Sequence, residues 1–252
     1  MINVLIDTLI SVVIVSLVSF VGVISLLLRP KLLDEMLLVL VSLSAGALFG
    51  DAIIHLLPEA AENGFTLSIS LYTLSGVLTF FLLEKIIHWQ HCHLPLPKQK
   101  SSKHVHRLGI INLVGDGLHN FIDGLIIAGS FLINVPTGIA TTIAVVFHEI
   151  PQEIADFGVL IYAGFSKGRA LFFNFLSAAF AIVGGIIGYA LGSSSGSFIQ
   201  FLLPFTAGGF IYVAGSNLIP ELHKSCDFKD SIWHIIALIV GVALMVGLRF
   251  LE

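Results

Sequence analysis

The amino-acid sequence predicts a polytopic, all-α membrane protein, and both its composition and its apolar segments support this class. Hydrophobic residues make up 56% of the 252 residues, charged residues only 11%, and the mean hydropathy is +1.00. A soluble domain carries about 25% charged residues, whereas a helix needs about 20 consecutive apolar residues to span a bilayer. Apolar runs of this length follow one another along the whole chain. We therefore expect a single transmembrane domain.

Eight apolar runs predict eight transmembrane helices. They lie at residues 4–28, 34–57, 67–89, 109–132, 138–163, 169–191, 200–221 and 232–250. The first contains Asp7, lacks a basic segment before it and is longer than the apolar part of a signal peptide, so we interpret it as a helix rather than a cleavable signal. The third leads into a loop rich in histidine, and the fourth and fifth contain polar strings. The sixth carries Gly184 and Gly188, whose four-residue spacing permits close helix packing.

Basic residues predict the orientation of these helices. Lys and Arg occur in every connection from an odd-numbered run to the next even-numbered run, and the even-to-odd connections contain neither. Only Arg249 departs from this pattern. Because cytoplasmic loops are enriched in Lys and Arg, we expect the odd-to-even connections in the cytoplasm and both termini outside. The regular alternation also supports the count of eight.

Two segments of the chain resemble each other at a separation of 162 residues. Residues 46–59 read GALFGDAIIHLLPE and residues 208–221 read GGFIYVAGSNLIPE, so that His55 aligns with Asn217. Under the predicted topology the two segments cross the membrane in opposite directions, as in transporters built from inverted repeats. This pattern predicts a 3+2+3 arrangement of helices with the substrate near the midplane. Chance similarity over fourteen small and apolar positions is the alternative.

Polar strings interrupt the fourth and fifth runs. Residues 119–123 read HNFID and residues 148–153 read HEIPQE. In each string a histidine is followed four residues later by an oxygen-bearing side chain, which places both groups on one helical face. Ionisable groups inside a bilayer cost several kcal/mol each, and imidazole with carboxylate suits Zn²⁺ and its first-row neighbours. We predict a divalent-metal site here; helix-bridging hydrogen bonds alone are the alternative.

The predicted site has features that suit exchange of an ion. Pro151 cannot donate to the carbonyl of Phe147, so we expect a kink beside His148 and a carbonyl free to act as a ligand or hydration point. Two histidines and one aspartate would leave one coordination position open, unlike a closed structural zinc site. Protons compete with metal for such ligands, so occupancy should fall at acid pH.

These motifs resemble those of the ZIP (Zrt/Irt-like) divalent-metal transporters, and the resemblance covers essentially the full length. It rests on residues 116–124 (DGLHNFIDG) and 148–157 (HEIPQEIADF), supported by residues 50–59, the histidine-rich loop and residues 208–221. The resemblance implies an eight-helix fold with both termini outside. It also implies uptake of Zn²⁺, or of Fe²⁺, Mn²⁺ or Cd²⁺, towards the cytosol, with no organic cofactor.

The same resemblance implies a set of metal ligands. A first site falls on His119, Asp123, His148 and Gln152. A neighbouring second site falls on Asn120 and Glu149 and shares Asp123 and Gln152. Asp123 stands where many members have Glu, and Gln152 where others have Glu or His. We therefore expect the His119–Asp123–His148 site and leave open whether one or two ions bind.

Further polar residues are candidates for the transport path. They are Asp51, His55, Asp116, Glu153, Asp156 and Asn174. Asp51, His55 and Asn174 could instead make interhelical hydrogen bonds, and Asp116 could instead support a ligand. The loop after the third helix, predicted at residues 90–107 in the cytoplasm, is flanked or occupied by five imidazoles and a thiol. These are His88, His91, Cys92, His93, His104 and His106. We expect them to capture metal transiently after release; a polar linker without essential histidines is the alternative.

The predicted function is transport of a divalent metal into the cytoplasm, most readily zinc, through a site on the fourth and fifth helices. The alternative is an intramembrane zinc metallohydrolase, because residues 148–152 approach the pattern H-E-x-x-H, although the second histidine is missing. A metal sensor or scaffold without transport is a further class. The expected partners are metal ions and the lipid of the cell (inner) membrane, without nucleic acid. A homodimer is left open.

Overall fold

The computed structural model describes residues 2–26, 30–92, 102–223 and 228–250, which form helices joined by short turns, with no strand among them. The prediction of an all-α protein is confirmed for these residues. Six helical stretches within them are long and apolar enough to cross a membrane. They are Asn3–Val23, Met36–Ala60, Leu67–Lys85, Lys167–Ser194, Gly196–Leu222 and Ser231–Arg249. The chain is therefore a multi-pass membrane protein.

The helical elements follow the apolar runs in order. The first half comprises α1 (Ile2–Val18) with the 3₁₀ helix η1 (Ser19–Leu26), then α2 (Pro30–Gly50) with the π-helix η2 (Asp51–Leu56) and α3 (Leu57–Ala60), then α4 (Leu67–Cys92). The central pair comprises α5 (Ser102–Ile133) and α6 (Val135–Tyr162). The last half comprises α7 (Lys167–Ala178) with α8 (Phe180–Ser194), α9 (Gly196–Tyr212) with the π-helix η3 (Val213–Leu218) and α10 (Ile219–Leu222), and α11 (Phe228–Arg249).

The helices α5 and α6 are not among the six apolar stretches, although each exceeds the roughly 20 residues that a bilayer requires. α5 has 32 residues and α6 has 28. Both carry the polar strings found in the sequence, and these residues lower their mean hydropathy. The count of eight spans stays a prediction, with α5 and α6 as the two spans in question.

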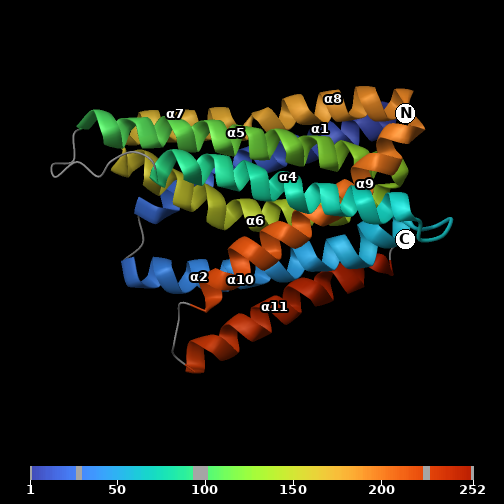
Figure 1. The fold of residues 1–252 in the computed structure, drawn as a ribbon. Coiled ribbons are helices and arrows are strands. Elements are labelled where there is room, and N and C mark those ends of the chain that lie inside the picture. The colour runs from blue at the N-terminus through green and yellow to red at the C-terminus, as the bar shows by residue number, and fades with distance from the viewer. Residues whose placement is uncertain (1, 27–29, 93–101, 224–227, 251–252) are drawn as a thin grey trace.

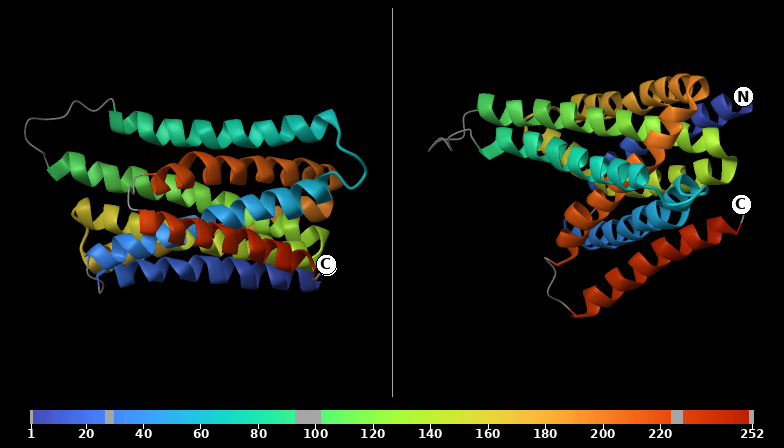
Figure 2. Two further views of the ribbon diagram at one scale, coloured as in Figure 1. Left: turned by 90° about the horizontal axis from the view of Figure 1, so that it is seen from below. Right: turned by 45° about the vertical axis from the view of Figure 1, so that its right-hand side comes forward.

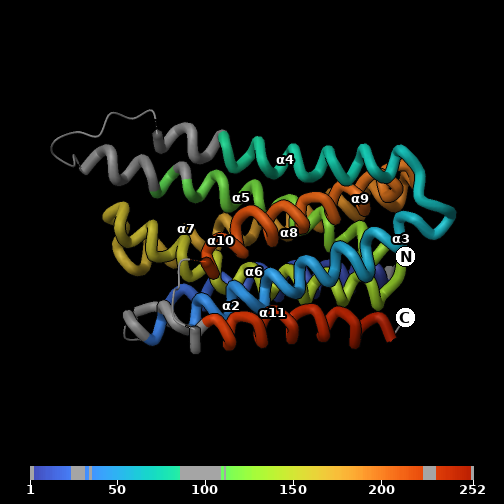
Figure 3. The backbone as a smooth tube through the Cα atoms, turned by 60° about the horizontal axis from the view of Figure 1, so that its bottom comes forward, coloured from blue at the N-terminus to red at the C-terminus, as the bar shows by residue number. Residues whose placement is uncertain are grey.

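The helices lie side by side along one long axis, and the labelled N- and C-terminal ends lie at the same end of the bundle (Figures 1 and 3). α5 packs on α8, α6 on α1 and η1, α2 on α11, and α4 on α9. If the first three apolar runs are exchanged with the last three in order, and α5 with α6, the contact of α5 with α8 becomes that of α6 with α1. The contact of α2 with α11 becomes that of α9 with α4. The packing therefore has the internal symmetry that two related halves produce. Views from two further directions show the same arrangement (Figure 2).

The two similar sequence segments also share an irregular backbone. η2 and η3 are π-helices that begin 162 residues apart, and each leads into a short helix with proline in its first turn. Pro58 and Pro220 lack the N–H that would bond to the carbonyl four residues earlier, and a π turn accommodates that break. α2 and α9, which precede these turns, run in opposite directions in the bundle (Figure 1).

Equivalent glycines bring the helices of each half into contact. A Cβ atom on Gly46 would collide with the carbonyl of Leu238 in α11, and one on Gly208 would collide with the carbonyl of Thr73 in α4. Gly184 of α8 meets the backbone of α5 in the same way. Small residues at these positions let helix backbones approach closely, as the glycine spacing of the sixth apolar run predicts.

The connection between α4 and α5 is shorter than the predicted 90–107 loop. α4 continues to Cys92 and α5 begins at Ser102. His88, His91 and Cys92 therefore lie on the last turns of α4, and His104 and His106 on the first turns of α5. His93 lies outside the described residues. Helical hydrogen bonding continues beyond the apolar stretches, which is why composition misplaced both helix ends.

Candidate metal centre between α5 and α6

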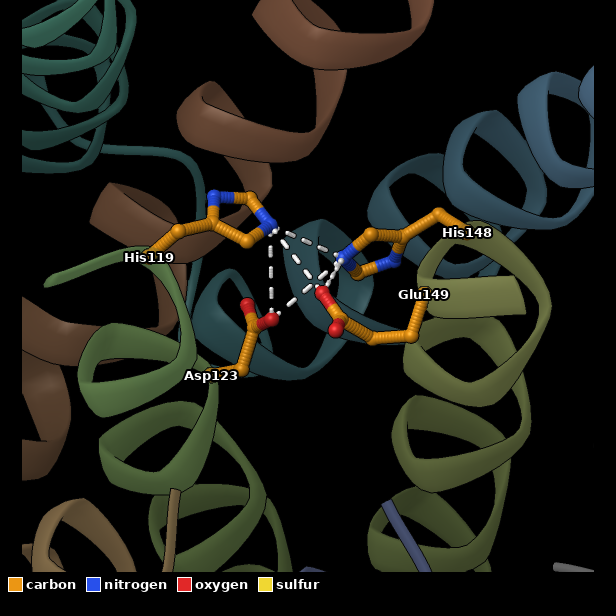
Figure 4. A group of neighbouring side chains, drawn as sticks. All are labelled: His119, Asp123, His148 and Glu149. Carbon is orange, nitrogen blue, oxygen red and sulfur yellow. Dashed lines mark hydrogen bonds and ion pairs between the residues drawn. The ribbon is translucent and has the colours of Figure 1, made fainter. Parts of the chain in front are cut away.

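Four potential ligands converge between α5 and α6. His119 and Asp123 lie one turn apart on α5, and His148 and Glu149 are adjacent on α6 (Figure 4). One ligand atom from each side chain lies within 4.8 Å of all the others. Asp123 and Glu149 are fully buried, whereas the side chain of His119 is 18% exposed. The centre is thus enclosed on most sides and accessible at His119.

Five of the six separations between the four ligand atoms are close to the edges of one tetrahedron, and the sixth is below 4.8 Å. The two imidazole Nε2 atoms are 3.1 Å apart. Asp123 Oδ2 lies 3.4 Å from His119 Nε2 and 3.3 Å from His148 Nε2. Glu149 Oε1 lies 3.5 and 3.4 Å from the same two nitrogens. An ion at the centre of a tetrahedron with such edges would lie about 2.0 Å from each atom, which matches Zn²⁺ bonds to imidazole and carboxylate.

The protein holds the imidazoles in place before any ion binds. His148 Nδ1 lies 3.2 Å from the carbonyl of Ala144, so that Nδ1 donates and Nε2 is left to face the centre. The His119 ring meets Phe80 and His148 edge to face, with ring centroids 6.2 and 5.3 Å apart. A second edge-to-face contact joins His148 to Phe210 at 6.1 Å. These contacts limit the rotation of both rings, which lowers the entropy lost on binding an ion.

The carbonyl freed by Pro151 has a protein partner. α6 continues through Pro151, and the hydroxyl of Ser44 on α2 donates to the carbonyl of Phe147 at 2.5 Å. This bond occupies one of the two lone pairs of the carbonyl oxygen, and its service as a ligand or hydration point stays a prediction. The bond also fastens α2 to α6 beside His148.

The structure places Asn120 and Gln152 against Asp116 rather than against the imidazoles. Asn120 Nδ2 donates to the Asp116 carbonyl at 3.2 Å and to Oδ1 at 2.9 Å. Gln152 Nε2 donates to the same Oδ1 at 3.2 Å. Glu149, assigned by resemblance to the second site, places Oε1 beside the two histidines. Asp116 Oδ1 thus accepts from both amide groups.

Glu153 on α6 and Asn174 on α7 are bonded to each other. Asn174 on α7 donates to Glu153 Oε2 at 2.5 Å and to the carbonyl of Ser19 at 3.3 Å, which ties α7 to both α6 and η1. Both side chains are fully buried. Asp116, Glu149 and Glu153 form a second group whose ligand atoms also lie within 4.8 Å of one another.

A cavity of about 750 Å³ reaches the centre from one end of the bundle. Its walls include His119, His148, Asp116, Gln152, Asn112 and Asp156, and on the opposite side Glu84, Tyr212, Asn217 and Glu221. Asn112 donates to Asp156 at 2.9 Å, and the Tyr212 hydroxyl donates to Glu84 at 2.7 Å. The cavity walls include the later turns of α4 and the early turns of α5, so it extends towards the end where those helices meet.

Asp51 and His55 lie apart from the cavity. Both are fully buried on η2. Asp51 Oδ2 accepts from the Thr141 hydroxyl at 3.0 Å, and His55 Nε2 lies 2.9 Å from the carbonyl of Met245. These bonds join η2 to α6 and to α11.

Sequence reasoning missed Ser44, Glu84 and Asn112. Asn112 had a detectable signal, because it precedes Asp116 by four residues and His119 by seven and so falls on the same face of α5. Ser44 and Glu84 act on other helices, and no spacing within one helix could have linked them to the centre.

Comparison with known proteins agrees with the geometry. The family model described as "ZIP Zinc transporter" matches residues 3–108 and 90–249. A fruit-fly protein (Drosophila melanogaster), "Zinc transporter ZIP13 homolog", is 30% identical over 86% of this chain and 79% of its own length. "Zinc transporter ZIP13" of the orangutan Pongo abelii is 33% identical over 82% of this chain and 65% of its own. "Zinc transporter SLC39A7" of the rat (Rattus norvegicus) is 30% identical over 86% and 66%.

Proposed function

This chain belongs to the ZIP zinc transporter family, and from that premise we propose that it carries Zn²⁺ into the cytoplasm through the centre between α5 and α6. The observation that carries this proposal is the tetrahedral spacing of four ligand atoms, 3.1–3.5 Å apart where measured, inside a membrane protein. Two neutral imidazoles and two carboxylates bring a charge that one divalent cation balances. Nitrogen and oxygen ligands in this geometry favour Zn²⁺ over the larger, oxygen-seeking ions.

The topology proposed for the chain has eight spans, with α5 and α6 between two groups of three. Both termini then lie outside, and the basic connections lie in the cytoplasm. The symmetric helix contacts and the two π-helices at equivalent positions support an inverted repeat. In such transporters the substrate site lies where the halves meet, near the midplane.

The side to which the cavity extends supports the proposed direction of transport. It runs from His119 towards the end where α4 and α5 meet, and the connection there is one of the basic ones. On the other side of the centre, the Asp51–Thr141 hydrogen bond joins η2 to α6. This arrangement supports a conformation that releases the ion to the cytoplasm.

Uptake of radiolabelled Zn²⁺ into proteoliposomes tests the proposal. The purified protein should move Zn²⁺ into the vesicles, and the His119→Ala and His148→Ala variants should not. A folded wild-type protein that binds Zn²⁺ without any flux would refute transport and favour a sensor. Unlabelled Fe²⁺, Mn²⁺ and Cd²⁺ added as competitors would rank the metals that the centre accepts.

A further inference from the structure

A groove of about 500 Å³ runs between α5 on one side and α7 with α8 on the other, helices that lie side by side in the bundle (Figure 1). Its walls carry large apolar side chains that are about half exposed, among them Val114 of α5 and Phe180 of α8. Ser177 is the one polar side chain among the described residues that line it, and its hydroxyl donates to the carbonyls of Phe173 and Asn174. The groove therefore suits a hydrocarbon chain.

The length of the groove matches one leaflet of a bilayer. Along α5 its lining extends from Ile110 to Phe121, and along α7 and α8 it extends from Phe173 to Val183. At a rise of 1.5 Å per residue these stretches are roughly 15–17 Å long, which is about half of the ~30 Å hydrocarbon core of a bilayer. A phospholipid acyl chain occupies one leaflet, so a single chain would fill the groove from end to end.

Positive charge lies at only one end of the groove. Lys167 and Arg169 belong to the first turn of α7, and Arg169 precedes the groove residue Phe173 by about one turn. Residues 108–166 and 170–223 contain no Lys or Arg. The groove therefore has a basic end, where the headgroup of an anionic lipid would lie, and no cation farther along it.

The first turns of α5 lie at the same end. Gly109 is so close to the α6–α7 connection that a Cβ atom on it would collide with Ala163 and Phe165. Lys103 and Arg107 precede Gly109 by six and two residues in α5. The fold thus brings the basic segments at the starts of α5 and α7 to one end of the groove.

The two cations of α7 have no acidic partner. The sequence contains no Asp or Glu between Asp156 and Glu221. Within the described part of the chain neither Lys167 nor Arg169 is paired with a carboxylate, and both side chains are exposed. Basic pockets between transmembrane helices bind the headgroups of anionic lipids. Charge complementarity therefore identifies the occupant of the groove as a lipid with an anionic phosphate headgroup.

We propose that the groove binds one anionic phospholipid, with an acyl chain between α5 and α7–α8 and the headgroup at Lys167 and Arg169. Under the proposed topology this lipid belongs to the cytoplasmic leaflet, because the α6–α7 connection is one of the basic ones. Lipid binding requires no metal in the centre. The site adjoins the metal path, since Val114 and Leu118 of α5 line both the groove and the cavity. The lipid therefore packs against the helix that carries His119.

Native mass spectrometry of the full-length protein tests this site. Protein in detergent is mixed with phosphatidylglycerol and phosphatidylcholine that have the same acyl chains, and the bound lipids are identified and counted. The wild type should retain one phosphatidylglycerol and prefer it roughly 30-fold, which is what two cations near a membrane surface contribute. Glycerol 3-phosphate, which has the phosphate but no acyl chain, should not compete. Equal retention of the two lipids, or competition by glycerol 3-phosphate, would overturn the proposal.

A pair of charge variants tests the headgroup position. Lys167→Gln/Arg169→Gln should bind the two lipids equally. Lys85→Gln/Arg249→Gln is the matched control, because it removes two exposed cations from α4 and α11, which do not line the groove. The control should keep the preference for phosphatidylglycerol. An unchanged preference in the first variant, or the same loss in both, would show that the headgroup does not bind at α7.

A pair of tryptophan variants tests the position of the acyl chain. Leu176 lines the groove and is 46% exposed, whereas Ile186 of α8 is 50% exposed and lies outside it. Leu176→Trp should fill the groove and abolish lipid retention, and Ile186→Trp should retain the lipid. Retention of phosphatidylglycerol by Leu176→Trp would contradict the proposal. A change in the number of chains per particle in Leu176→Trp, measured by light scattering, would assign the groove to a second copy of the chain instead.

Discussion

Replacing His148 by Ala gives the most direct measure of the metal centre. The variant removes one of four ligands whose measured separations are 3.1–3.5 Å and leaves the other three in place. Structural Zn²⁺ sites with four ligands bind with about 10–16 kcal/mol at neutral pH, which corresponds to roughly 2.5–4 kcal/mol for each ligand. Because 1.4 kcal/mol is a factor of ten, the Kd for Zn²⁺ should rise roughly 100- to 1,000-fold.

Competition with a chromogenic chelator measures this Kd in the purified protein. In proteoliposomes, uptake by His148→Ala should fall to background at Zn²⁺ concentrations that half-saturate the wild type. His55→Ala is the matched control, since His55 is also buried and its bond to the Met245 carbonyl lies outside the centre. It should lower thermal stability and leave the Kd unchanged. Wild-type affinity in His148→Ala, or an equal loss in His55→Ala, would refute the assignment of His148 as a ligand.

The other predictions concern affinity, packing and the loop. Gln152→Glu should strengthen Zn²⁺ binding, because it places a second carboxylate beside Asp116; a metal-dependent rise in Tm no larger than that of the wild type would contradict this. Gly208→Ala should lower stability by about 1–3 kcal/mol through overpacking against Thr73. Gly158→Ala should leave stability unchanged, because its Cβ would meet no described atom within 4 Å. Thermal unfolding measures both variants. Serine at the histidine and cysteine positions around the α4–α5 connection should preserve uptake and alter turnover or the response to excess metal, and complete loss in folded protein would contradict this. The positions are His91, Cys92, His93, His104 and His106.

The sequence predicted an all-α protein because the bilayer imposes a minimum apolar length on each helix. The third run, predicted at 67–89, corresponds to α4 at Leu67–Cys92, and the repeat at 162 residues corresponds to the paired π-helices. Helix ends were less predictable. Apolar composition marks where lipid contact ends, whereas backbone hydrogen bonding continues into polar segments such as the first turns of α5.

The sequence singled out the residues that cluster here, but it did not show which of them lie together. The four-residue spacing grouped Gln152 with His148, and the resemblance assigned Glu149 to a second site. In the structure Glu149 faces both imidazoles and Gln152 turns to Asp116. Which of these two side chains faces the imidazoles depends on the residues of the neighbouring helix. A single sequence does not show which residues those are. Ser44 is a further case, because its bond to the Phe147 carbonyl depends on how α2 lies against α6.

α5 and α6 can cross the membrane although they are not among the six apolar stretches, because their polar side chains are buried inside the protein. Asn120, Asp123 and Glu149 are fully buried, whereas Val135 and Ile139 of α6 are 44% and 42% exposed. The exposed Val114 and Leu118 of α5 line the cavity. Mean hydropathy averages over the whole circumference of a helix, but the cost of a polar group depends only on whether that group contacts lipid. α8 covers α5, and α1 with η1 covers α6. Two helices that are polar towards each other and apolar towards lipid can therefore span the bilayer and enclose a metal site, which supports the eight-span topology.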